Sequence, residues 1–98
     1  MTKTPYTFTA EIWKHQGPGA WHFMTLPIDL SKEIRALFKQ HEEGWGRLKV
    51  SAKIGAGEWN TSIWFDSKSK QYLLPIKSSI RLKEKLVLDK KYDCQLWI

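Results

Sequence analysis

The chain has 98 residues, the usual size of one small domain, and 42% of them are hydrophobic, which excludes a disordered polypeptide. Its single cysteine excludes an internal disulfide, and this is typical of a reducing compartment. The formal net charge of +6 permits contact with nucleic acid or an acidic partner, although an ordinary soluble surface carries such a charge too.

The first part of the chain, up to about residue 44, predicts two strands and a helix. Apolar and polar residues alternate from Tyr6 to Trp13, which indicates a half-buried strand, and residues 16–19 form a turn. A second strand, Trp21 to Leu26, closes a hairpin, and Pro27 ends it because proline has no N–H to donate. The apolar residues that follow have helical spacing: Leu30, Ile34, Leu37 and Phe38.

The flanking residues predict where this helix begins and ends. The side chain of Asp29 or Ser31 can accept a hydrogen bond from the first free backbone N–H groups, as an N-cap does. Gly44 favours the left-handed conformation that ends many helices. We therefore expect a positive φ at Gly44, at the end of the first helix.

The rest of the chain predicts four more strands and a shorter helix. Residues 48–54 alternate most regularly, residues 59–65 carry tryptophan on both faces, which favours a strand covered on both sides, and residues 71–74 end at Pro75. Ser78 or Ser79 is predicted to cap a helix that extends to about Leu86. Alternation from Tyr92 to Ile98 predicts the last strand.

A tripeptide repeat divides the chain into two halves. Leu26-Pro27-Ile28 and Leu74-Pro75-Ile76 are identical and lie 48 positions apart, and an Ile-Arg pair follows each of them, at Ile34-Arg35 and Ile80-Arg81. Each half then contains two strands, a short helix and a strand. The fold class predicted is mainly β: one six-stranded barrel domain spanning residues 1–98, with residues 1–5 as a polar tail, built from two ββαβ halves with pseudo-two-fold symmetry.

Metal binding and catalysis find little support in the residue pattern. His15, His22 and His41 fall on a turn, a strand and a helix end, without the spacing of a ligand pair, and only Cys94 could add a thiolate. We interpret Cys94 as a small buried residue, with a reactive thiol as the alternative. Since neither a nucleophile motif nor a phosphate loop is present, we expect no cofactor and no enzymatic activity.

Four residues are candidates for binding a small ligand. Lys77 and Arg81 follow the second strand-ending proline, where a basic residue could hold a phosphate or a carboxylate. The alternative for Arg81 is an ion pair with Glu84. Tyr72 and Trp64 complete the predicted pocket, because Trp64 falls opposite the apolar face of its strand.

Three cations are candidates for nucleic-acid binding. Arg47, Lys49 and Lys53 alternate with the apolar residues of one strand and so share its polar face. Trp64 and Trp97 could add a stacking surface beside them. If the face is open, we expect weak, salt-dependent binding of DNA or RNA; a helix covering the face would prevent it.

The chain resembles the DUF1905 family of domains of unknown function. The resemblance covers about Phe8 to Trp97 and is most specific at Gly44-Trp45-Gly46 and at Leu74-Pro75-Ile76-Lys77 with the following Arg81. It implies a double-split β-barrel, the architecture of AbrB- and MazE-type DNA-binding proteins, and carries over no functional residues. One departure lies at Asp89, where the family usually has a Gly-Asp turn before the last strand.

Two functions of different classes remain open. The first is a soluble, non-enzymatic binding module that recognises a small ligand or a protein through a groove between barrel and helices. The alternative is a nucleic-acid-binding, AbrB-like regulator, although fold analogy is a weak argument for function. We further expect a monomeric, cytoplasmic protein without membrane contact, because no apolar segment approaches membrane-spanning length.

Overall fold

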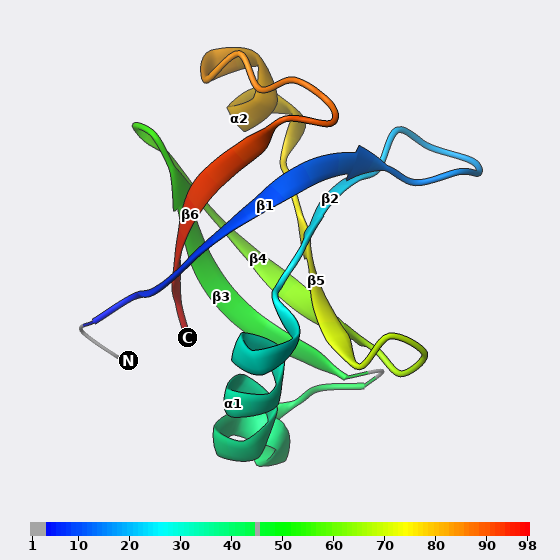
Figure 1. Cartoon of the computed structure of the whole chain (residues 1–98), viewed down its shortest axis with the longest axis vertical. Helices are drawn as coiled ribbons and strands as arrows, with labels where there is room; N and C mark the ends of the chain where they lie inside the picture. The colour runs from blue at the N-terminus through cyan, green and yellow to red at the C-terminus, as the bar shows by residue number, and fades with distance from the viewer. Residues whose placement is uncertain (1–3, 45) are drawn as a thin grey trace.

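The structure of the protein is a computed structural model that describes residues 4–44 and 46–98. The predicted strands and helices are all present, each within a few residues of its expected position (Figure 1). In chain order they are β1 (Tyr6–Lys14), β2 (His22–Thr25), α1 (Ile28–Phe38) with a 3₁₀ turn (Lys39–His41), β3 (Arg47–Ile54), β4 (Gly57–Asp66), β5 (Gln71–Pro75), α2 (Ser78–Lys83) and β6 (Lys91–Trp97).

The six strands form a closed antiparallel barrel in the order β1-β2-β5-β4-β3-β6, with β6 returning to β1. A closed sheet has no free edge, so every strand has a partner on both sides. The two helices lie at opposite ends of the barrel in Figure 1, and neither lies along a strand of the wall. The mainly β barrel predicted from the sequence is therefore confirmed.

The barrel has the predicted two-fold topology. When the halves are exchanged, so that β1, β2 and β3 become β4, β5 and β6, all neighbouring pairs remain the same. A matching pair of backbone hydrogen bonds shows the relation in detail. The N–H of Leu26 donates to the carbonyl of Tyr72 at 2.9 Å, and the N–H of Ile76 donates to the carbonyl of His22 at 2.8 Å.

The repeated tripeptides are not structurally equivalent, however. The two matching bonds relate Leu26 to Ile76 and His22 to Tyr72, an offset of 50 positions, whereas the tripeptides are 48 apart. Pro27 accordingly precedes α1, while Pro75 is the last residue of β5. A shift of two residues keeps each side chain on the same face of its strand, so the tripeptide still marks the correct pair of strands.

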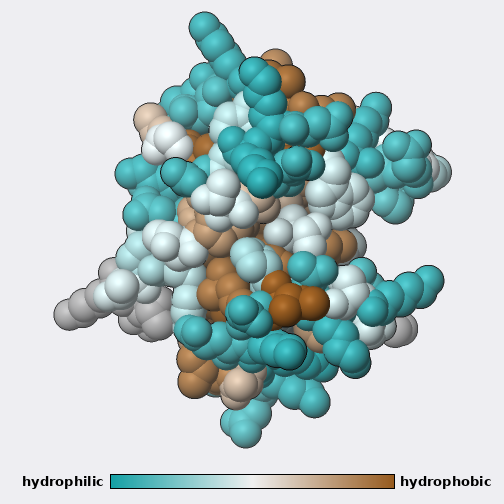
Figure 2. Space-filling model, viewed as in Figure 1, coloured by the Kyte–Doolittle hydropathy of each residue, from teal (hydrophilic) through white to brown (hydrophobic). Residues whose placement is uncertain are grey.

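Alternation along the strands places the core inside the barrel. On β3 the apolar residues are buried as predicted, while Arg47 and Lys49 are exposed on the outer face. Figure 2 shows hydrophilic residues gathered over the two ends of one face, with paler and more apolar residues between them. Residues with no exposed surface lie on both halves: Met24, Leu26, Ile34, Ile63, Tyr72, Leu74 and Leu96.

Both helices begin earlier than their polar residues predicted. Pro27 occupies the N-cap of α1 and Lys77 that of α2, and neither cap makes a side-chain hydrogen bond. The φ of −54° at Pro27 is close to the value that the proline ring imposes, so the residue is unstrained at this cap. Ser31 instead lies buried in α1, where its hydroxyl accepts the N–H of Tyr72 at 3.0 Å and so joins the helix to β5.

Both helices also end earlier than predicted. The first ends at Phe38, and Gly44 lies beyond it, in the turn where Glu43 and Arg47 exchange two backbone hydrogen bonds. Its φ of 51° is positive as expected, but it does not cap the helix. The second helix ends at Lys83 because Lys85 adopts a φ of 54°, and the N–H of Leu86 bonds to the carbonyl of Arg81.

The departure from the family pattern at Asp89 leaves the turn intact. Asp89 adopts a φ of 66°, a conformation that glycine enters freely and aspartate tolerates better than most residues. Its N–H donates to the carbonyl of Ile12 at 2.9 Å, which ties the turn before β6 to β1.

Replacing Gly44 by Ala is expected to reduce the free energy of unfolding by about 1 kcal/mol, because alanine is strained at a positive φ. Gly44→Asn is the matched control, since asparagine tolerates the left-handed region and its loss should be smaller. Urea denaturation of the three proteins measures the difference. Equal midpoints for wild type and Gly44→Ala would contradict the assignment of strain to this turn.

Candidate functional site

An open hollow lies at the end of the barrel where β5 leads into α2. We call it the α2 cleft; its volume is about 450 Å³, in the range of small-molecule sites. Segments from three parts of the chain meet there: the start of β2, the middle of β4, and the connection from β5 through the first turn of α2. The residues that matter for its chemistry are Trp21, His22, Asn60, Lys77, Ser78 and Arg81.

Arg81 and His22 contact each other in the α2 cleft, with 3.3 Å between Nη1 and Nε2. The other ring nitrogen of His22, Nδ1, lies 2.7 Å from the carbonyl oxygen of Ala20. A carbonyl can only accept, so Nδ1 carries the proton and the lone pair of Nε2 accepts the N–H of Arg81. Both ring nitrogens of His22 are thus engaged.

The guanidinium of Arg81 is only partly satisfied by this contact. Its Nε is buried without a hydrogen-bond partner, and no described carboxylate forms an ion pair with it. The alternative partner Glu84 points elsewhere and accepts the backbone N–H of Ala56 at 3.2 Å. Lys77 adds a second positive charge, and no acidic residue is found among the described residues that line the cleft. The cleft is therefore suited to an anion.

A second hollow, which we call the tryptophan groove, runs over strands β3, β4 and β6. Its volume is about 760 Å³, and it contains Trp21, Trp64, Trp97, Arg47, Lys49 and Asn60. The cations and aromatic residues that the sequence placed on polar faces thus meet in one place. Trp64 is 40% exposed and Trp21 48%, so the predicted cover over both faces of β4 is wrong at Trp64.

Two of the predicted site residues lie outside both hollows. Lys53 forms an ion pair with Glu58 at 3.8 Å and lines a separate depression beside β1 and β6. Tyr72 has no exposed surface, so it cannot contact a ligand, although it was predicted in the pocket with Arg81 and Trp64. The sequence pattern of β5 did not show which way the side chain of Tyr72 points. In the structure its hydroxyl bonds to Glu42, which follows α1 and the 3₁₀ turn.

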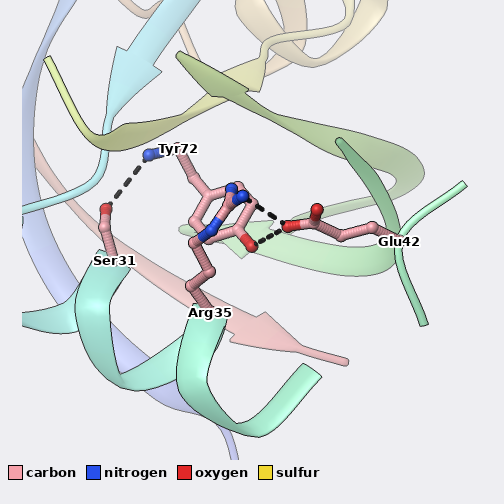
Figure 3. Close-up of polar contacts among 4 residues, drawn as sticks. All are labelled: Ser31, Arg35, Glu42 and Tyr72. Atoms are coloured by element: carbon pink, nitrogen blue, oxygen red, sulfur yellow. Dashed lines mark hydrogen bonds and ion pairs between the residues drawn. The ribbon is translucent and has the colours of Figure 1, made fainter. Parts of the chain in front are cut away.

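Tyr72 belongs to a buried polar network, drawn in Figure 3. Its hydroxyl donates to Oε2 of Glu42 at 2.5 Å, and the same oxygen pairs with Nη1 of Arg35 at 3.5 Å. The guanidinium of Arg35 also lies 3.6 Å over the ring of Phe65, in cation–π geometry. Burial, with the Glu42 carboxylate beside it, raises the pKa of Tyr72 well above its usual 10.0. The network is structural.

Residues of metal or thiol chemistry do not gather in the described part of the chain. No group of three or more His, Cys, Asp or Glu residues is placed there to hold a metal ion. Cys94 is buried, and burial raises the pKa of its thiol to about 12, which agrees with a core residue. Trp45, part of the Gly-Trp-Gly element, lies outside the described residues.

Sequence reasoning missed His22 and Trp21 as site residues. His22 was considered only as a metal ligand, and Trp21 only as a packing residue. Their position at the start of β2 could have revealed them, because the two-fold relation places His22 opposite the beginning of α2. That signal becomes readable only once the offset of 50 between the halves is known.

The fold and these hollows define a small closed β-barrel with an open cationic and aromatic surface. The chain belongs to the DUF1905 family, a domain of unknown function, whose model matches residues 8–96. No curated protein matches the chain. In the part of the chain that the structure describes, no helix is both long and apolar enough to cross a membrane. The family description names no activity, so function has to be argued from the two hollows.

Tyr72→Phe is expected to make the free energy of unfolding depend less steeply on pH in the alkaline range. The pKa of Tyr72 is raised in the folded state, so its contribution is complete below about pH 10 and is lost as pH rises above that. Wild type should therefore lose stability more steeply than Tyr72→Phe between pH 9 and 11. Urea denaturation across this range measures it; Cys94 and Tyr6, whose pKa values are also raised, titrate in both proteins. Parallel pH profiles would contradict burial of the phenol.

Proposed function

We propose that this domain is a non-enzymatic binding module whose α2 cleft takes a small ligand with an anionic group. The observation that carries the proposal is Arg81. Its guanidinium lies in an open cleft, one buried N–H has no partner among the described residues, and no described carboxylate pairs with it. Charge-assisted hydrogen bonds to such a group are among the stronger polar contacts. Lys77 lines the same cleft and adds to the attraction.

The same geometry argues against catalysis in the cleft. A general base needs a free nitrogen or oxygen within reach of a nucleophile. His22, the one histidine lining the described part of the cleft, uses Nδ1 for the carbonyl of Ala20 and Nε2 for Arg81. Ser78 shares the cleft, but no hydrogen bond joins it to His22 among the described residues. Binding is the better use of these groups.

Arg81→Met is expected to weaken the binding of inorganic phosphate about tenfold or more, because charge-assisted hydrogen bonds contribute roughly 1.5–3 kcal/mol. Chemical-shift titration of the full chain with phosphate measures the dissociation constant. Lys83→Met is the matched control: it removes the same charge from the exposed side of the same helix. Equal weakening by both variants would mean that only net charge matters, and the proposal would be overturned.

Nucleic-acid binding, the function of an AbrB-like regulator, is the second candidate. The observation in its favour is that Arg47 and Lys49 lie beside Trp64 and Trp97 in one open groove, and no residue of α1 or α2 is among its described lining. The ion pair between Lys49 and Glu43 is exposed and 3.9 Å long, so it contributes little. Single strands suit such a surface, since phosphates pair with cations and bases stack on aromatic rings.

For this candidate, replacing both Arg47 and Lys49 by Gln should weaken the binding of a labelled single-stranded oligonucleotide. The loss should be the same for all sequences, because phosphate contacts carry no sequence information. The slope of log affinity against log salt concentration should decrease in magnitude by roughly 1.4, because each lost phosphate contact to a single strand accounts for about 0.7. Fluorescence anisotropy at low salt measures both quantities. A double Gln variant of Lys90 and Lys91, exposed cations elsewhere on the surface, is the control. The same loss in both double variants would exclude a specific role for the groove.

A further inference from the structure

The α2 cleft and the tryptophan groove are neighbours on the barrel surface. Four residues line both of them: Trp21, Asn60, Thr61 and Pro75. A ligand larger than a simple anion can therefore contact residues of both hollows. The shared residues lie at the start of β2, in the middle of β4 and at the end of β5.

Positive charge and aromatic rings alternate along this combined site. Arg81 and Lys77 line the α2 cleft, and Arg47 and Lys49 line the tryptophan groove. Between them, Trp21 and Trp64 contact each other with ring centroids 6.1 Å apart, and both rings are partly exposed. The order along the surface is cations, aromatic rings, cations. A complementary ligand therefore carries an anionic group, then a planar ring, and then a second anionic group.

We propose that the two hollows form one nucleotide site. Arg81 and Lys77 hold a phosphate, and the base stacks on one of Trp21 and Trp64 and contacts the other with its edge, since the two rings are inclined at 50°. The inference rests on the proposed anion-binding function and names its ligand class. Phosphate and a planar base are shared by a free nucleotide and by a nucleotide within a single strand. In the second case Arg47 and Lys49 receive the next phosphate.

Polar groups between the cations and the rings fit the sugar or the edge of a base. Asn60 accepts the hydroxyl of Ser51 through Oδ1 at 2.7 Å, so its amide N–H groups are left to donate to a ligand. Thr61 lines both hollows and carries a hydroxyl that donates and accepts. The aromatic platform is held from behind, because Trp21 stacks on Phe23 with an interplanar angle of 11°. A platform fixed before binding loses little freedom when a base stacks on it.

The test separates the base from the phosphate. The full chain is titrated by calorimetry with adenosine 5′-monophosphate, ribose 5-phosphate and adenosine. Adenosine 5′-monophosphate should bind about tenfold more tightly than ribose 5-phosphate, because base stacking on an aromatic ring adds affinity of that order. Trp64→Leu should remove this advantage and leave ribose 5-phosphate unchanged. Arg81→Met should weaken the binding of adenosine 5′-monophosphate and of ribose 5-phosphate by the same factor.

Failure of the inference and failure of the proposed function give different results. If ribose 5-phosphate binds as tightly as the nucleotide, or if neither Trp64→Leu nor Trp21→Leu changes the preference, the nucleotide inference is overturned and anion binding stands. If neither phosphate compound binds, both are overturned. Circular dichroism checks that each variant is folded.

A short single-stranded oligoadenylate distinguishes the two sources of the nucleotide. If binding is tighter than that of adenosine 5′-monophosphate, and if the gain is lost when Arg47 and Lys49 are both replaced by Gln, the nucleotide is part of a strand. If there is no gain over the monophosphate, the site takes the free nucleotide. The double Gln variant of Lys90 and Lys91 again serves as the control for surface charge.

Discussion

The pairing of β2 with β5 is the contact on which the rest of the structure depends. Met24 and Leu74 lie opposite each other at the centre of this pair, and both are fully buried. Each of the two strands leads directly into a helix, so the pairing places both helix starts relative to the partner half. Without it, neither the matching hydrogen bonds of Leu26 and Ile76 nor the α2 cleft would form.

The two halves use equivalent positions for different purposes. Ser31 in α1 corresponds to Arg81 in α2, and each meets the equivalent residue of the other half, Tyr72 or His22. In the first case the small serine allows close approach, and Glu42 completes a buried network. In the second the larger arginine meets a partly exposed histidine, and an open cleft results. The two-fold relation thus gives two equivalent helix–strand contacts. They differ in side-chain size and burial, and only the contact between Arg81 and His22 lies in an open cleft.

The proposed site also depends on what the helices leave uncovered. Because the helices lie at the ends of the barrel, the outer faces of β3 and β4 between them stay open to solvent (Figure 1). Trp64 and the cations Arg47 and Lys49 are exposed there for the same reason. Trp21 lines both this surface and the α2 cleft, so aromatic and basic side chains from distant parts of the chain lie in neighbouring hollows.

The sequence by itself determined the elements, the barrel and the duplication. Period-two alternation shows which face of a strand is buried, and a repeat shows that the strands come in related sets, and neither needs knowledge of distant contacts. It also placed Arg47, Lys49 and Trp64 correctly on outward faces. Only the tertiary structure decided the offset between the halves, because a two-residue shift leaves the alternation unchanged. Only it buried Tyr72 against Glu42 and brought His22 to Arg81, because these contacts join residues 30 and 59 positions apart.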